Sequence, residues 1–469
     1  MYKALFVAAI LISPTANAMQ CDISEALHTA QQLELQIQSQ HLDNGIQLYW
    51  LPMANKQTVT IASQFNVGSR NEGKGQTGYA HLFEHLLFKG SDNAPENTYP
   101  NTMNGIGARF NASTHFDYTN YYATIPSHAI ELALFLESDR FRRPIITPAS
   151  VENQQGAVIE EMASTIDSQP FFRVAMEFLL AQVSDTPYGH AIIGNKQDVL
   201  GATASSLQAF HQQYYQPNKM TMAVVGDVPS DIYSKVEAHF GDWQAQTTLA
   251  HTFAPIDIQA KPVHGKVYDN RGPWPALLLA WHTRGRSHPD AAALALLNQY
   301  LFSHNTSLMQ HTQRNEAQAL FNYSFPMAMD NHGVANIVLV PRAKVSLDDL
   351  FDLVTKQIEQ VISEGIDANS LCRIKHSSTS TLITQFHQPQ TVAKRLINIA
   401  QQDLDQPLSG PISRIDAVTN EDIQRVAQQY FQHKTIRLDL FPPWYIRTGK
   451  TVLEWLPESL THSLEDKAL

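Results

Sequence analysis

Cysteine is nearly absent from this chain: Cys21 and Cys372 are the only two among 469 residues. Neither lies in the setting of a catalytic thiol, and one pair allows a single internal disulfide at most. In an oxidising compartment an even pair favours such a bridge. The sequence does not decide whether this disulfide forms, because it does not show whether the two Cα atoms come within bonding range.

Positive charge and long apolar runs are also scarce. The chain has 33 Lys and Arg against 44 Asp and Glu, a net charge of −11. It therefore offers no basic stripe to neutralise phosphates, which argues against a nucleic-acid partner. Beyond the N-terminus no uninterrupted apolar stretch approaches about 18 residues, so we expect no membrane span in the mature chain. The hydrophobic content of 43% supports full cores in two or more domains.

The N-terminus has the pattern of a signal peptide. Lys3 supplies a short positive region, residues 4–12 are apolar, and Ala16-Asn17-Ala18 is a small-x-small cleavage site. We expect cleavage after Ala18 and export, to a bacterial periplasm or beyond the cell. The residues before Cys21 do not form a lipobox, so a lipid anchor is not expected.

A pair of histidines four residues apart, with a glutamate between them, is the strongest chemical signal. The segment is His81-Leu82-Phe83-Glu84-His85. On a helix, positions i and i+4 share a face, so both imidazoles can reach one metal ion. The order His-x-x-Glu-His is the inverted form of the common zinc-peptidase motif. A catalytic zinc takes three protein ligands, so the pair needs one more.

Two adjacent carboxylates downstream provide candidates for the third ligand. Glu160 and Glu161 lie in a segment that is predicted to be helical from about residue 148 to residue 164. Neighbouring helical residues point about 100° apart, so only one of the two can face the metal. The spacing alone does not decide which one it is.

With these motifs the sequence resembles the pitrilysin/insulinase family, which includes mitochondrial processing peptidase. The resemblance is specific from about residue 38 to residue 245 and looser to about residue 440. It implies that His81, His85 and Glu161 bind one Zn²⁺ and that Glu84 is the general base. Other segments follow the family's order: Leu42–Ile46, Asn111–Ser113, Thr119–Tyr122, Pro187–Gly189, Ile193–Gly194, Tyr214–Asn218 and Val225–Asp227.

The resemblance also implies how a peptide substrate is held. An extended peptide would add as a strand beside Asn111 and Ala112. Family members use an Arg and a Tyr seven residues later to hold the substrate; here Arg314 is present but Phe321 takes the tyrosine position. Tyr323 is a possible substitute, because residues i and i+2 share one face of a strand.

Two further departures from the family are expected to have consequences. Gln154 stands where many members carry a glutamate seven residues before the metal-binding one. The change removes a charge near the metal and is expected to weaken metal binding or rate without abolishing the chemistry. The Gly-rich loop that is typical of the second half is replaced by the segment 302–307.

The chain reads as an internal duplication, with a metal-binding domain at 19–245, a linker at 246–262 and a second domain at 263–469. In the second half Ala295, Asn298 and Gln299 replace His81, Glu84 and His85, so that half cannot bind the metal in the same way. Each half shows strands near its start and end, with helices between them, and this order predicts an α+β fold. Examples of the expected strands are residues 58–62, 220–225 and 276–281. The family resemblance makes it two similar α/β sandwich domains.

The expected activity is zinc-dependent hydrolysis of peptides by an endopeptidase or oligopeptidase. The alternative is a non-catalytic core, scaffold or peptide-binding subunit of a larger complex. The family's active sites lie between two such chains, so we expect a dimer. Arg314 favours a homodimer, whereas Phe321 and the missing glycines favour a heterodimer with a sister chain.

Overall fold

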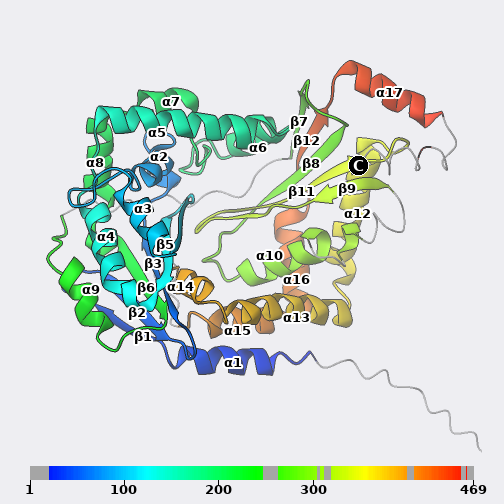
Figure 1. The fold of residues 1–469 in the computed structure, drawn as a ribbon. Coiled ribbons are helices and arrows are strands. Elements are labelled where there is room, and N and C mark those ends of the chain that lie inside the picture. The colour runs from blue at the N-terminus through cyan, green and yellow to red at the C-terminus, as the bar shows by residue number, and fades with distance from the viewer. Residues whose placement is uncertain are drawn as a thin grey trace, which may run out of the picture.

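The computed structural model describes residues 21–246, 262–303, 307–310, 318–398, 406–455 and 461. Two mixed β-sheets, one in each half of the chain, form the framework, and helices surround them (Figure 1). The expected signal peptide, residues 1–18, lies outside the described residues, as does the linker except for residues 246 and 262. In the described part of the chain no helix is long and apolar enough to cross a membrane.

The first sheet has the strand order β1-β2-β6-β3-β5-β4. β2 and β6 run parallel, and the other neighbours are antiparallel. The strand β4 therefore forms one edge of the sheet. The strands are β1 (Gln38–His41), β2 (Gln47–Pro52), β3 (Thr58–Phe65), β4 (Arg109–Thr114), β5 (Thr119–Pro126) and β6 (Met220–Gly226).

The second sheet repeats this plan. Its order is β10-β11-β8-β12-β7, and β9 also pairs with β11. The parallel pair β7 and β12 corresponds to β2 and β6, and the antiparallel β8 and β11 correspond to β3 and β5. The shared topology agrees with the predicted duplication. The strands are β7 (Val263–Tyr268), β8 (Ala276–Thr283), β9 (Ala319–Tyr323), β10 (Met327–Ala328), β11 (Gly333–Pro341) and β12 (Ile436–Phe441).

The helices of the two halves lie around these sheets (Figure 1). In and before the first half they are α1 (Ser24–Glu34), α2 (Tyr79–Leu86), α3 (Thr98–Gly105), α4 (Ile130–Arg142), α5 (Pro148–Glu161), α6 (Phe172–Ala181), α7 (Lys196–Gly201), α8 (Ala204–Tyr214) and α9 (Ile232–Phe240). In the second half they are α10 (Ala291–Asn298), α12 (Leu347–Glu364), α13 (Ala368–Gln385), α14 (Pro389–Ile397), α15 (Ser409–Ala417), α16 (Asn420–Val426) and α17 (Trp444–Glu454).

The first sheet is buried on both faces. Along β6, Met222 and Val224 join the main core with the helices of the first half, whereas Ala223 and Val225 join a second cluster on the opposite face. That opposite face is covered by α14, which comes from the second half. Strands buried on both faces show apolar residues at successive positions rather than an alternation with polar ones.

The second sheet is covered in the reciprocal way. Along β8, Leu277, Leu279 and Trp281 pack in the core of the second half. Leu278 and Ala280 point to the other face, where they pack with Ala175 and Leu179 of α6 from the first half and with Phe171 just before it. Figure 1 shows α6 reaching across to the second sheet. The halves therefore exchange covering helices.

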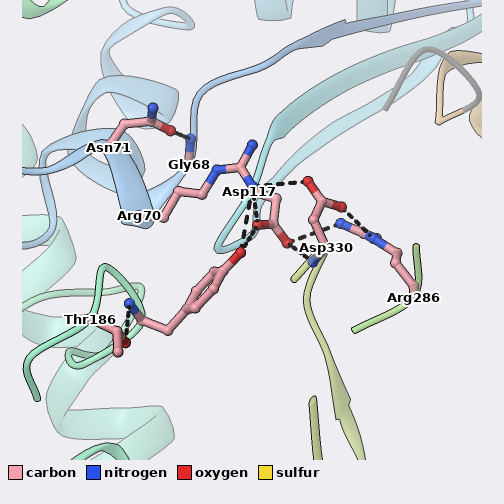
Figure 2. A network of polar contacts seen from close by, with 8 residues as sticks. Gly68, Arg70, Asn71, Asp117, Thr186, Arg286 and Asp330 are labelled. Carbon is pink, nitrogen blue, oxygen red and sulfur yellow. Dashed lines mark hydrogen bonds and ion pairs between the residues drawn. The ribbon is translucent and has the colours of Figure 1, made fainter. Parts of the chain in front are cut away.

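A buried ionic network makes a further contact between the halves (Figure 2). Asp117, between β4 and β5, accepts hydrogen bonds from Arg70 at 2.7 Å and from Arg286 at 3.1 Å. Asp330, just before β11, is bound by the same two arginines at 3.0 and 2.7 Å. The Tyr188 hydroxyl donates to Asp117 at 2.7 Å. Two positive charges thus balance two negative ones at the junction, as buried charges require.

The sequence placed the main elements well. The strands expected at 58–62, 220–225 and 276–281 are β3, β6 and β8. The helix expected from 148 to about 164 is α5, which ends at Glu161 and continues as a π-helical turn, Met162–Asp167. The exchange of α6 and α14 between the halves was not predicted.

The exchanged helix α14 makes a testable contribution to stability. Leu396 is fully buried between α14 and the first sheet. Leu396→Ala should lower the free energy of unfolding by about 2–5 kcal/mol, because it removes apolar contacts and leaves a cavity. Urea denaturation measures the change. Leu35→Ala, at a position 80% exposed, is the matched control and should change stability by less than about 0.5 kcal/mol. Equal effects of the two variants would contradict the covering role of α14.

Candidate metal centre and active site

The helix α2, which carries the histidine pair, begins in a tightly fixed turn. Gly78 at its start has φ +93, and a side chain there would lie 2.6 Å from the carbonyl oxygen of Ile193. Only glycine fits this conformation and this close approach. The buried carboxylate of Glu72 accepts hydrogen bonds from the N–H groups of Gly78 and Ala80, both at 2.7 Å. It thereby satisfies helix donors that have no partner within the helix.

His81, His85 and Glu161 converge on one point. Nε2 of His81 lies 3.7 Å from Oε1 of Glu161, and Nε2 of His85 lies 3.4 Å from Oε2. The three ligand atoms all fall within 4.8 Å of one another. The histidines come from α2 and the carboxylate from the last residue of α5, which packs against α2.

This arrangement fits zinc. Two ligands about 2.0–2.1 Å from a tetrahedral ion lie about 3.4 Å apart, close to the separations seen here. Two imidazoles and one carboxylate form a common catalytic donor set that leaves the fourth position for water. Nδ1 of His81 is buried and has no hydrogen-bond partner in the described part of the chain, so the orientation of this ring is not fixed by a second hydrogen bond.

The electrostatics favour ligands in their metal-binding forms. Burial, with the neighbouring His85, lowers the pKa of His81 to about 4, so its imidazole is neutral near pH 7. The hydrogen bond from His85, together with the nearby His81, lowers the pKa of Glu161 below its ordinary value. Metal binding needs neutral histidine and ionised carboxylate, and both are the favoured states here.

Glu84 lies beside the metal position but is held differently. Its side chain is buried, and Oε2 accepts a hydrogen bond of 2.5 Å from the Thr114 hydroxyl at the end of β4. Burial raises the pKa of Glu84, and the Thr114 hydrogen bond opposes that rise. A carboxyl group with a raised pKa in a partly dry site suits a role in proton transfer.

Asn111 and Ala112 lie on β4, at the edge of the first sheet and beside α2. Asn111 is exposed, while Ala112 packs into the core. In the described residues β4 pairs only with β5, so its other edge is open to an added strand. The edge therefore has the position that a strand-adding peptide requires.

The residues expected from the second half are only partly described. Arg314 lies outside the described residues. Tyr323 is at the end of β9 and is 56% exposed, and its ring stacks on Phe321 and Phe325. Phe321 and Tyr323 do share one face, and both line an apolar groove of about 660 Å³ beside α6.

Glu160 and Gln154 occupy other sides of α5. Glu160 is exposed and is not part of the metal-binding group. Gln154 is buried and donates to Asn153 at 2.5 Å. The expected effect of Gln154 on metal binding or rate stays a prediction.

In the second half, two of the residues that correspond to the His-x-x-Glu-His motif make hydrogen bonds inside the protein. Asn298 donates to Ser303 at 2.7 Å, and Gln299 accepts from Ser378 at 2.8 Å. Within the described residues, no group of potential metal ligands forms around α10.

Fold and site together define a class of protein: a duplicated α+β chain with a His-x-x-Glu-His helix and a distant carboxylate. Family comparison agrees. The family model "Insulinase (Peptidase family M16)" matches residues 51–196, and "Peptidase M16 inactive domain" matches residues 201–378. The chain belongs to peptidase family M16.

Curated relatives match over most of their length. An uncharacterized zinc protease of Mycobacterium leprae is 27% identical over 401 residues, covering 83% of this chain and 88% of the relative. Zinc protease PqqE of Helicobacter pylori is 24% identical, covering 83% and 89%. The probable mitochondrial-processing peptidase subunit beta of Arabidopsis thaliana is 24% identical, covering 86% and 77%.

Solved structures share the fold. A protease from Helicobacter pylori superposes with a TM-score of 0.79 at 24% identity, covering 87% of this chain and 99% of that one. The periplasmic protease PqqL of Escherichia coli has a TM-score of 0.72 at 18% identity, covering 92% of this chain and 50% of that one. This chain thus has the fold of half of that longer protein.

Thr114 is the site residue that sequence reasoning missed. The strand had been recognised around Asn111–Ser113, and alternation puts Thr114 on the same buried face as Ala112. That period-2 pattern was the available signal. Its contact with Glu84, however, depends on the packing of β4 against α2, which the sequence does not specify.

The two adjacent glutamates give a matched test of the ligand set. Glu161→Gln should release zinc at modest chelator concentrations, because it removes the only carboxylate in the group. Glu160→Gln makes the same change from carboxylate to amide at an exposed position, and it should leave the zinc content unchanged. Metal analysis after dialysis against a chelator measures both. Loss of zinc from Glu160→Gln alone would show that the ligand is assigned to the wrong residue.

Proposed function

We propose that this chain is a zinc-dependent endopeptidase or oligopeptidase that binds one Zn²⁺. The observation that carries the proposal is the convergence of His81, His85 and Glu161, with Glu84 on the same helix as the histidines. The zinc proteases among the relatives support it. Hydrolysis is favoured over a scaffold role, because the metal-binding group and the candidate base are both retained.

Bound zinc would acidify a water molecule and polarise the scissile carbonyl. The protein's own part in the reaction falls to Glu84. Its carboxylate would take a proton from the attacking water and then deliver it to the nitrogen of the leaving amine. Thr114 would hold the carboxylate in place through its hydrogen bond to Oε2, which leaves Oε1 to exchange the proton.

The substrate would be an extended peptide paired with the open edge of β4, beside Asn111 and Ala112. Backbone hydrogen bonds would provide affinity, and pockets for alternate side chains would provide selectivity. This position is supported by Thr114, which ends the same strand and contacts Glu84. In a homodimer, Arg314 and Tyr323 in the second half of the other protomer would contribute to substrate binding.

Glu84→Gln separates proton transfer from metal binding. The amide has the same size and can still accept from Thr114, so zinc content and thermal stability should stay near those of the unchanged protein. Peptide hydrolysis should fall by about 10²–10⁴-fold or more, because the proton acceptor is lost. A fluorogenic peptide assay with matched metal analysis measures this, and Glu160→Gln serves as the active control. Undiminished turnover by Glu84→Gln would exclude the proposed mechanism.

The active form would be a dimer that closes a chamber, and the chain would be exported to the periplasm. The signal-peptide pattern supports export. A relative named mitochondrial-processing peptidase subunit beta supports the heterodimer, since such a name describes one subunit of a larger enzyme. A sister chain would then supply the Arg and Tyr that are only partly retained here.

Solution mass and activity together test the assembly. The purified chain alone should show weak peptidase activity, and addition of a sister chain should raise it together with the mass of the complex. Arg314→Ala should reduce activity in a homodimer but leave it nearly unchanged in a heterodimer. A monomer that is fully active and unaffected by Arg314→Ala would contradict both forms of the dimer.

A further inference from the structure

The two cysteines of the chain meet although 351 positions separate them. Cys21 lies three residues before α1 and is half-buried, and Cys372 lies on α13 and is 1% exposed. Both are free thiols in this structure, and their Sγ atoms fall within 4.8 Å of each other. No other cysteine exists in the sequence, so this is the only internal pair that can form.

The surrounding packing fixes this encounter. Ile23, two residues after Cys21, is buried in the cluster between the halves, and α1 lies against α13 and α15. At the other end of α1, the Glu34 carboxylate accepts hydrogen bonds from the Leu408 N–H and the Ser409 hydroxyl. Both ends of α1 are therefore attached to the second half, and Cys21 is held beside Cys372.

We propose that Cys21 and Cys372 form an intramolecular disulfide that ties the segment before α1 to the second half of the chain. The partner in this reaction is a disulfide-bonded oxidant, either a small disulfide or an exported oxidoreductase. One thiolate attacks the oxidant and forms a mixed disulfide, releasing the first thiol. The second cysteine then displaces the other thiol. Two protein thiols are oxidised, and one oxidant disulfide is reduced to two thiols.

The alternative is a metal ion held by Cys21, Cys372 and His376, which lies one turn along α13. A structural zinc site is closed by four ligands, and only three potential ligands gather here in the described part of the chain. Burial, with the hydrogen bond that Cys21 donates to Cys372, raises the pKa of Cys21 to about 12. A disulfide needs only the two sulfurs and leaves no ionisable group at this position. The disulfide is therefore the better match to this environment.

The bridge would act across the whole fold. α1 leads directly into β1 of the first sheet, while α13 belongs to the second half, so the link joins both halves outside the active site. A cross-link that closes a long loop stabilises mainly by restricting the unfolded chain. It would keep α1 in place over the cluster that α14 shares with the first sheet.

Thiol counting by intact mass tests the proposal. The full chain, exported through its own N-terminus in a bacterial host, is denatured and alkylated before and after reduction. We expect no alkylation before reduction and two after it, with one cross-linked peptide pair containing Cys21 and Cys372. Reduction should lower Tm by several degrees, and Cys21→Ser/Cys372→Ser should show no such shift.

Three results would overturn the proposal. The first is two free thiols in protein that was purified after export and incubated with oxidised glutathione. The second is a disulfide-linked dimer of two chains in place of the internal bridge. The third is zinc that stays bound in Glu161→Gln and is lost on adding Cys372→Ser, which would show a metal site at the cysteines. None of these measurements depends on peptidase activity, so the proposed function can fail without affecting them.

Discussion

The burial of both faces of both sheets is the constraint on which the rest of this structure depends. β6 and β8 carry apolar side chains at successive positions, so neither sheet can leave one face in water. Each half covers one face of its sheet with its own helices. The other face of the first sheet is covered by α14 from the second half, and the other face of the second sheet is covered by α6 from the first half. Each half therefore depends on the other to cover one face of its sheet.

The candidate metal site lies next to one of the exchanged helices. Glu161 ends α5, and the chain continues through a π-helical turn into α6, which is anchored on the second sheet. The histidines, in contrast, sit on α2, whose start is fixed within the first half by Gly78 and Glu72. α5 nevertheless packs against α2, and both helices contribute to the core of the first half. The separation of the carboxylate from the imidazoles is therefore set mainly by packing within that half.

The sequence predicted what depends on local spacing. The helical period was enough to predict that the two histidines share one face. Runs of apolar residues were enough to predict the strands β3, β6 and β8. The choice between Glu160 and Glu161 required family resemblance, because both fit a helix equally well. The Thr114 contact, the Asp117 and Asp330 network and the exchanged helices involve residues that are distant in sequence. No periodicity encodes such contacts, because they arise from tertiary packing.

The duplication explains why one half keeps the metal ligands and the other does not need them. In the second half Ala295, Asn298 and Gln299 take the places of His81, Glu84 and His85. The Asn298 amide donates to Ser303 and Gln299 accepts from Ser378, whereas Oδ1 of Asn298 is buried without a partner among the described residues. In the first half Glu72 accepts from the start of α2 and Thr114 binds Glu84, so both partners come from outside the motif. The two halves therefore use one fold differently: the first gathers His81, His85 and Glu161 beside α2, and the second uses the matching positions for internal contacts and covers the first sheet with α14.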